Sequence, residues 1–220
     1  MSDSARALPS RRPGRPVLCL VVDRGSTAHS LPEAVAEAVA GGVDWVQLRD
    51  RELEGGRWLA WAEELAAVAR SQAADVCVVV NRRADMALAL KADGVHLGFD
   101  AMTPAHARKL LGDEALVGVS THEATEIRAL DAGVVDYVHL APIYDPLSKV
   151  SSRPALGLDA LAGAHAPGLP VIAQGGLCAD NCADVIRAGA AGIAVTGAIL
   201  AAESPRQASA RLRSALDRSP

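Results

Sequence analysis

The chain has 220 residues, half of them apolar, and a formal net charge of −4 at pH 7. This length fits one large domain, and the apolar share is enough to form a sizeable core. The mildly acidic balance, with no basic stripe along the chain, argues against a nucleic-acid partner. No stretch approaches the roughly 18 uninterrupted apolar residues of a membrane span, so we expect no membrane partner.

The first 16 residues, "MSDSARALPSRRPGRP", carry four arginines and three prolines but no apolar run of the kind found in secretory signals. We therefore expect a flexible tail over residues 1–16 and a cytoplasmic barrel domain over residues 17–220. The cysteines are scattered and lack a second Cys or His pair nearby, so we expect them to be reduced and structural. They are Cys19, Cys77, Cys178 and Cys182.

From Pro16 onward, short β-rich runs alternate with helical patterns rich in alanine, leucine and glutamate. Eight strands are predicted, at residues 17–22, 43–49, 76–81, 94–98, 116–120, 136–141, 170–174 and 192–196. Such continuously apolar strands are typical of a parallel sheet covered by helices, and their number favours a closed (β/α)8 TIM barrel in a single domain. The alternative is a doubly wound open sheet, which usually has a glycine-rich first turn; here that turn, "DRGSTAHS", has one glycine.

Two of the connecting segments carry clear helix signals. In "LPEAVAEAVAGG", Pro32 suits a first helical turn and Gly41 suits a C-terminal stop. In "RWLAWAEELAAVARSQ", one face of the predicted helix carries Trp58, Trp61, Leu65 and Val68. Both segments follow predicted strands, as a strand-then-helix barrel requires.

In a barrel of this kind, the active site lies at the carboxyl ends of the strands. Gln47 and Arg49 are two residues apart at the end of the second predicted strand, so both should point to the barrel mouth. Val46 and Leu48 should then face the helices. The alternative for Arg49 is a structural role in an ion pair with Asp50 or Glu52.

Two further polar residues lie at the end of a predicted strand or in a loop that follows one. Asn81 ends the third strand, where it is either a binding residue with both a donor and an acceptor or a turn-forming residue. Lys149 lies in the longest loop, residues 141–157, which is either a lid or binding loop over the mouth or a solvated connection.

The fifth strand ends in "GVSTHE", which places Ser120 and His122 on alternate positions and therefore on one side. His122 starts the following loop and is the best candidate for general acid or base chemistry near neutral pH, with a solvated helix cap as the alternative. His96 and His139 lie inside apolar strands, where we expect satisfied core residues.

The exits of the seventh and eighth strands, "AQGGLCADN" and "AVTGAI", carry glycines. Glycines at the start of a helix leave backbone N–H groups open, and the late loops of such barrels commonly bind phosphate in this way. Simple turn chemistry is the alternative. The predicted phosphate-binding residues are Gly175, Gly176, Thr196 and Gly197.

Several of these exits resemble one family, the thiamin phosphate synthase and TenI (thiazole tautomerase) superfamily. The similarity covers about residues 17–203 and is carried by "VQLRDR", "VNRRADMALALKADGVHLG", "GVSTH", "DYVHLAPIYDPLSK", "PVIAQGGL" and "AGAAGIAVTGAI". The resemblance implies a barrel that binds a small phosphorylated heterocycle. The residues that match the family's ligand contacts are Gln47, Arg49, Asn81, Ser120, Lys149, Gly175 and Gly176.

The two branches of the superfamily differ in their need for a metal. A synthase joins hydroxymethylpyrimidine diphosphate to thiazole phosphate, and Mg²⁺ held by two aspartates stabilises the departing pyrophosphate. At the two matching positions this chain has Arg82 and Ala101. A TenI-like tautomerase moves a proton and needs no metal, so we favour that isomerase, with no cofactor and with His122 as the proton shuttle.

Two alternatives to the tautomerase stay open. The first is a divergent thiamin phosphate synthase, a transferase, that retains Mg²⁺ through Asp100 or substrate phosphates. The second is a non-catalytic homologue that binds a ligand or regulates a partner. A homo-oligomer is compatible with the sequence, which does not define the oligomeric state.

Overall fold

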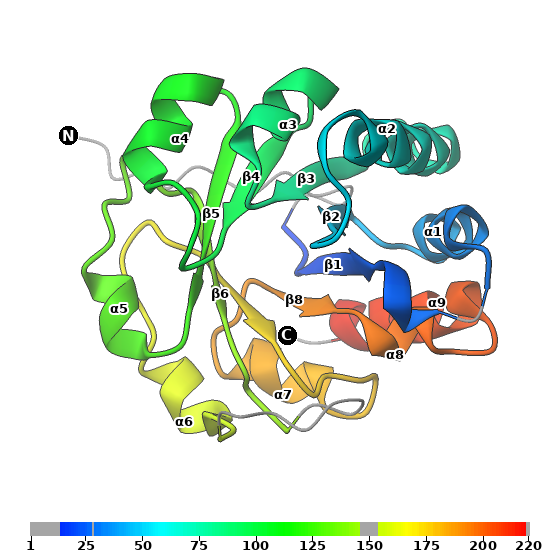
Figure 1. The fold of residues 1–220 in the computed structure, drawn as a ribbon. Coiled ribbons are helices and arrows are strands. Elements are labelled where there is room, and N and C mark those ends of the chain that lie inside the picture. Colours follow the sequence, from blue (N-terminus) through cyan, green and yellow to red (C-terminus); the bar gives the residue numbers. More distant parts are fainter. Residues whose placement is uncertain (1–13, 28, 146–153, 219–220) are drawn as a thin grey trace.

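The structure is a computed structural model that describes residues 14–27, 29–145 and 154–218. Its eight strands are all parallel and form a closed barrel in chain order, in which the last strand pairs with the first. Figure 1 shows the strands at the centre and the helices around them. The predicted single-domain (β/α)8 barrel is confirmed, and the open sheet is excluded. The predicted tail lies almost entirely outside the described residues.

All eight predicted strands are present, and their ends differ from the predicted ones by at most two residues. The prediction is this close because each strand is buried on both faces, which makes its sequence an almost unbroken apolar run. The strands are β1 (Val17–Asp23), β2 (Trp45–Arg49), β3 (Cys77–Asn81), β4 (Gly94–Leu97), β5 (Leu116–Thr121), β6 (Tyr137–Leu140), β7 (Val171–Gln174) and β8 (Gly192–Val195).

Helices follow the strands around the outside of the barrel. They are the 3₁₀ helix η1 (Arg24–Ser26) and the α-helices α1 (Leu31–Ala40), α2 (Gly55–Gln72), α3 (Ala84–Leu90), α4 (Pro104–Leu111), α5 (Ala124–Arg128), α6 (Gly157–Ala162), α7 (Cys182–Arg187), α8 (Gly197–Leu200) and α9 (Pro205–Asp217). Pro32 lies in the first turn of α1 and Gly41 caps its end, as predicted. Trp58 and Leu65 of α2 are buried, and Trp61 and Val68 are half-buried. Among the described residues, no helix is both long and apolar enough to cross a membrane.

In every strand except β4, apolar side chains alternate between two clusters. Val46 and Leu48 belong to the outer cluster, between the strands and the helices, as the spacing of β2 predicts. The inner cluster fills the barrel, where Trp45 and Tyr137 meet edge to face with ring centroids 4.9 Å apart. Gly118 is required beside them, because a Cβ at this position would lie 2.1 Å from the Tyr137 ring. The four cysteines are free, and three of them are buried, which agrees with a structural role.

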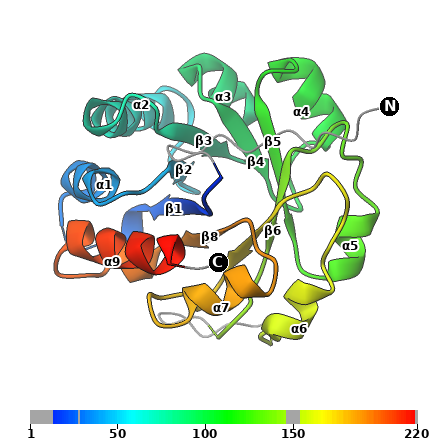
Figure 2. The same ribbon diagram turned by 180° about the vertical axis from the view of Figure 1, so that it is seen from behind.

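A buried ion pair ties the last helix to the first two strands. Asp44, just before β2, accepts hydrogen bonds from the backbone N–H of Leu18 at 2.8 Å and from Nη1 of Arg213 at 2.9 Å. Nη1 of Arg213, which belongs to α9, also donates to the carbonyl oxygen of Pro16 at 2.8 Å. Both charged side chains are almost fully buried. Figures 1 and 2 place α9 beside α1, next to the point where the barrel closes.

Candidate functional site

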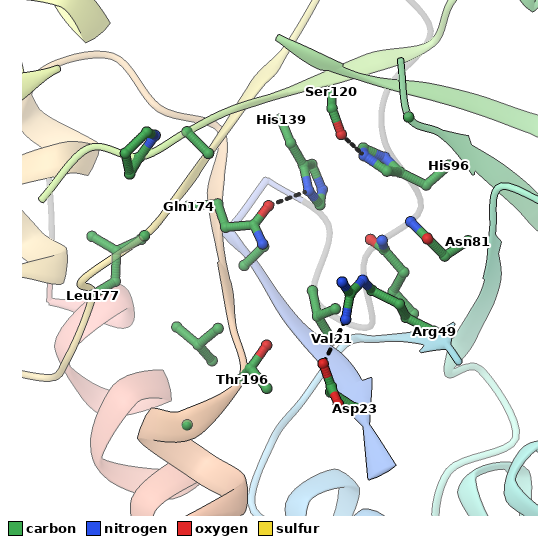
Figure 3. A pocket seen from close by; sticks show the side chains of 18 of the residues that line it. Val21, Asp23, Arg49, Asn81, His96, Ser120, His139, Gln174, Leu177 and Thr196 are labelled. Carbon is green, nitrogen blue, oxygen red and sulfur yellow. Dashed lines mark hydrogen bonds and ion pairs between the residues drawn. The ribbon is translucent and has the colours of Figure 1, made fainter. Parts of the chain in front are cut away.

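The carboxyl ends of all eight strands surround one cavity of about 770 Å³. Each strand contributes at least one lining residue at or near its carboxyl end. The cavity therefore lies at the end of the barrel where such folds bind their ligands. This volume falls within the ordinary range of small-molecule sites. Figure 3 shows the polar side chains that project into the cavity from the surrounding strands.

The structure brings nearly all of the predicted site residues to this cavity. Those that line it are Gln47, Arg49, Asn81, Ser120, His122, Gly175, Gly176, Thr196 and Gly197. Lys149 lies outside the described residues. The contact of each of these side chains and amides with a ligand stays a prediction.

Arg49 and Gln47 lie on the cavity side of β2, as their spacing predicts. Arg49 pairs with Asp23 at the end of β1, with Nη1 2.5 Å from Oδ2, and Figure 3 shows this contact. Arg49 is therefore paired with a residue of the neighbouring strand and not with Asp50 or Glu52, and Asp50 pairs with Arg24 instead. Gln47 is buried, and its Oε1 has no hydrogen-bond partner among the described residues. An acceptor of this kind is stabilised by a ligand that donates a hydrogen bond.

His122 is anchored at the rim of the cavity. Its Nδ1 donates to the carbonyl oxygen of Ala141 at 2.6 Å, and its ring stacks on Phe99 with centroids 4.6 Å apart. The cap of α5 is Glu123, which forms a capping box with Glu126. The alternative role of His122 as the helix cap is therefore wrong, because the neighbouring glutamate supplies that cap.

Two histidines that we expected to be satisfied core residues line the cavity, and among the described residues only His96 has partners at both ring nitrogens, with Nδ1 3.3 Å from Oη of Tyr137. His96 and His139 are buried, but both point into the cavity at the carboxyl ends of the strands, as Figure 3 shows. Nε2 of His96 lies 2.9 Å from Oγ of Ser120, and Nδ1 of His139 lies 3.1 Å from Oε1 of Gln174. Since Gln174 Oε1 accepts this bond, Nδ1 of His139 carries the proton and Nε2 keeps a lone pair. That Nε2 has no partner among the described residues, so the expectation of a satisfied core histidine is wrong.

Burial keeps both histidines neutral. It lowers the pKa of His139 to about 4, although the hydrogen bond to Gln174 acts in the opposite direction. It lowers the pKa of His96 well below its usual value, and the nearby His139 adds to the effect. Near neutral pH both imidazoles are therefore uncharged, and the unpaired Nε2 of His139 can accept a hydrogen bond from a ligand.

The lowered pKa of His139 predicts a loss of stability in acid. Below pH 6.5 the unfolded chain binds a proton at this residue while the folded chain does not, so the free energy of unfolding falls as the pH drops from 6.5 toward 4. For this residue alone the loss at pH 5 is about 2 kcal/mol. Urea unfolding of His139→Asn at pH 7.5 and pH 5 should show a smaller difference than the unaltered protein. His165→Asn, at an exposed histidine outside the cavity, should match the unaltered protein; equal losses in all three proteins would contradict the prediction.

The fold and the cavity together define a (β/α)8-barrel protein with a polar ligand site at the carboxyl ends of its strands. The family model described as "Thiamine monophosphate synthase" matches residues 18–199, which is most of the chain. This chain therefore belongs to the thiamine monophosphate synthase family, and the superfamily resemblance is confirmed.

Relatives of known name are similar along nearly their whole length. A protein of Azorhizobium caulinodans named thiamine-phosphate synthase is 40% identical, over 92% of this chain and 95% of its own. One of Mycolicibacterium smegmatis with the same name is 37% identical, over 97% of this chain and 98% of its own. The solved structure of a thiamine phosphate pyrophosphorylase from Pyrococcus furiosus superposes with a TM-score of 0.80 at 28% identity, over 92% and 96% of the two chains.

These relatives contradict the favoured prediction of a tautomerase. Proteins at this identity carry the name of a synthase, which is a transferase and not an isomerase. The prediction gave two positions, Arg82 and Ala101, more weight than the similarity of the whole barrel. The proton-shuttle role of His122 depended on the isomerisation and falls with it.

The residues at the cavity rim do not fit the magnesium ion that a synthase implies. Mg²⁺ prefers oxygen ligands in octahedral geometry. Ala101 has no donor, and the carboxylate of Asp100 lies 2.5 Å from a guanidinium nitrogen of Arg82, whose charge would repel a metal ion. In the described part of the chain, no three His, Cys, Asp or Glu side chains are grouped to hold a metal. The alternative metal ligand, Asp100, thus lies beside a positive charge and has no second carboxylate at position 101.

Proposed function

We propose that this protein is a thiamine-phosphate synthase. It would join hydroxymethylpyrimidine diphosphate to thiazole phosphate and release pyrophosphate. In this reaction a C–N bond forms to the thiazole nitrogen while the C–O bond to the diphosphate breaks, and the diphosphate keeps the electron pair. The observation that carries the proposal is the similarity, over 92% of this chain, to a protein that bears this name.

The floor of the cavity suits an aminopyrimidine. Oε1 of Gln47 and Nε2 of His139 are both acceptors, both are buried, and both lack a partner among the described residues. Each would gain a hydrogen bond from an N–H donor, such as the amino group of the pyrimidine. Leaving buried acceptors unpaired costs about 1–3 kcal/mol each, so a ligand that pairs them is favoured over one that cannot.

The glycine-bearing exits of β7 and β8 suit a phosphate. Gly175 and Gly176 have φ angles of +97° and +62°, and a Cβ at either position would collide with the segment from Pro142 to Asp145. These positions therefore require glycine, because the segment after β6 packs directly against them, and backbone N–H groups in such a turn can bind an anion. Under this proposal the phosphate of the thiazole binds the backbone amides of Gly175, Gly176, Thr196 and Gly197.

The remaining polar residues would orient the two heterocycles. Arg49, Asn81 and Ser120 also line the cavity. Lys149 is assigned to the same group by the family resemblance alone. His122, fixed by its bond to Ala141, would form part of the rim.

The activity is tested by incubating the purified full chain with both substrates and measuring thiamin phosphate and pyrophosphate by chromatography and mass spectrometry. We expect both products in equal amounts, and neither when one substrate is omitted. The assay should be run with EDTA and with added Mg²⁺. Absence of thiamin phosphate under both conditions would overturn the proposal.

A further inference from the structure

The cavity rim beyond β3 carries an arginine in an unusual backbone conformation. Arg82 follows Asn81 directly and has a φ angle of +68°, a left-handed conformation that side chains with a Cβ rarely adopt. Its backbone N–H donates to the carbonyl oxygen of His96 at 2.7 Å, which ties the residue after β3 to the end of β4. The side chain lines the cavity. The fold therefore maintains a guanidinium at this point at a conformational cost.

The carboxylate partner of this arginine is easily displaced. Nη2 of Arg82 lies 2.5 Å from Oδ2 of Asp100, and the two side chains are 36% and 66% exposed. An ion pair this exposed contributes little to stability, because water screens both charges. A diphosphate oxygen in the cavity can take the place of the carboxylate while Asp100 turns into solvent.

The rim provides positive charge at the positions where the family resemblance predicts metal-binding acids. Arg82 occupies one of these positions and Ala101 the other, and the cavity is also lined by Arg51 and by Arg49, which pairs with Asp23. A guanidinium is charged throughout the physiological pH range and donates two parallel hydrogen bonds to phosphate oxygens. It can thus supply the electrostatic stabilisation that a metal ion would otherwise give to a departing oxyanion.

We propose that Arg82 binds the diphosphate of the pyrimidine substrate and stabilises the charge that forms on its leaving oxygen, without a metal ion held by protein carboxylates. This inference rests on the proposed synthase function. As the C–O bond breaks, its electron pair passes to the diphosphate oxygen, which the Arg82 guanidinium stabilises, and the carbon that loses this oxygen forms the new C–N bond with the thiazole nitrogen. The step needs neither a proton nor a redox partner from the protein.

The binding of inorganic pyrophosphate in EDTA tests this role directly, by titration calorimetry on the full chain. The unaltered protein should bind, and Arg82→Ala should weaken binding by about 10- to 100-fold, as expected when a charged hydrogen bond is lost. Arg83→Ala is the matched control. Arg83 is the next residue, but it pairs with Asp85 and does not line the cavity, so its removal should leave the Kd unchanged.

A gain-of-function variant tests the exchange of metal for arginine. Arg82→Asp combined with Ala101→Asp restores two acids, so pyrophosphate binding should become weak in EDTA and recover with Mg²⁺. The inference is overturned if the unaltered protein binds pyrophosphate only with Mg²⁺, or if Arg82→Ala binds as tightly as the unaltered protein. If the double variant does not fold, the comparison of Arg82→Ala with Arg83→Ala still decides the question.

The two proposals fail in different ways. If pyrophosphate binds through Arg82 in EDTA but no thiamin phosphate forms under any condition, the synthase function is wrong and the anion site stands. If thiamin phosphate forms but pyrophosphate binding requires Mg²⁺, the synthase function stands and the role of Arg82 is wrong.

Discussion

Replacing Gly176 by alanine is expected to reduce the kcat/KM for thiamin phosphate formation by at least about 100-fold, the usual effect of a displacement of about 1 Å at a positioned group. A Cβ at this position would lie 2.4 Å from the carbonyl oxygen of Asp145 and 2.6 Å from the Cβ of Tyr144. These atoms belong to the backbone or lie next to it, so the loop itself must move. The φ angle of +62° adds strain for any residue other than glycine. Steady-state kinetics with both substrates measure the effect.

Gly189→Ala is the control that separates the effect of backbone strain from the effect of damage to the proposed phosphate site. Gly189 also has a positive φ angle, +102°, but no atom lies within 4 Å of the Cβ it would gain. It lies between α7 and β8, at the opposite end of the barrel from the cavity. This variant should lose some stability and keep normal kinetics. Normal kinetics in Gly176→Ala, with circular dichroism unchanged, would contradict the proposed phosphate site.

Replacing Asp44 by alanine is expected to lower the free energy of unfolding by about 3 kcal/mol, because it removes the fully buried counter-charge of Arg213 and leaves only the partly exposed Asp217, 2.7 Å from Nη2. The carboxylate of Asp44 also accepts from the N–H of Leu18, which would lose its partner in the same variant. Arg213 is almost fully buried and cannot turn to solvent without moving α9. Urea unfolding followed by circular dichroism measures the change.

Two controls distinguish a buried pair from a surface pair. Asp85→Ala breaks an exposed ion pair with Arg83 and should cost less than about 1 kcal/mol. The double variant Asp44→Asn and Arg213→Met removes both charges but keeps an acceptor for Leu18, so it should be more stable than Asp44→Ala. A loss below about 1 kcal/mol for Asp44→Ala would show that water reaches the guanidinium.

The architecture could be predicted from the sequence because every strand of this fold has the same apolar sequence pattern. A strand buried on both faces is an apolar run, and eight such runs separated by helical segments leave few alternatives. The start of β2 shows the limit. The apolar run begins at Val43, but the strand begins at Trp45, and the backbone N–H of Val43 donates to the carbonyl oxygen of Ala38 in α1 at 3.2 Å. The apolar pattern of the sequence does not encode this contact with the end of the helix.

Site residues could be predicted where the alternation of side chains between the inside and the outside of the barrel was applied. Residues were missed where it was not applied. The two-residue spacing placed Gln47 and Arg49 in the barrel, and the same rule applies to His96 and His139, whose strand neighbours belong to the outer cluster. Their apolar surroundings suggested a core position, although the inside of a barrel is itself lined by alternate residues. The ion pair of Arg82 with Asp100 could not be predicted, since it depends on the path of the turn after β4.

Closure of the barrel has a consequence for synthesis of the protein. Residues 17–20 of β1 pair with residues 192–195 of β8, and Arg213 reaches back to Pro16 and Asp44. A nascent chain that leaves the ribosome from its N-terminus therefore holds β1 with one unpaired edge until almost all of the polypeptide has been made. Exposed strand edges of this kind promote aggregation, so the interval before the final helix emerges is the period in which a chaperone would protect this chain.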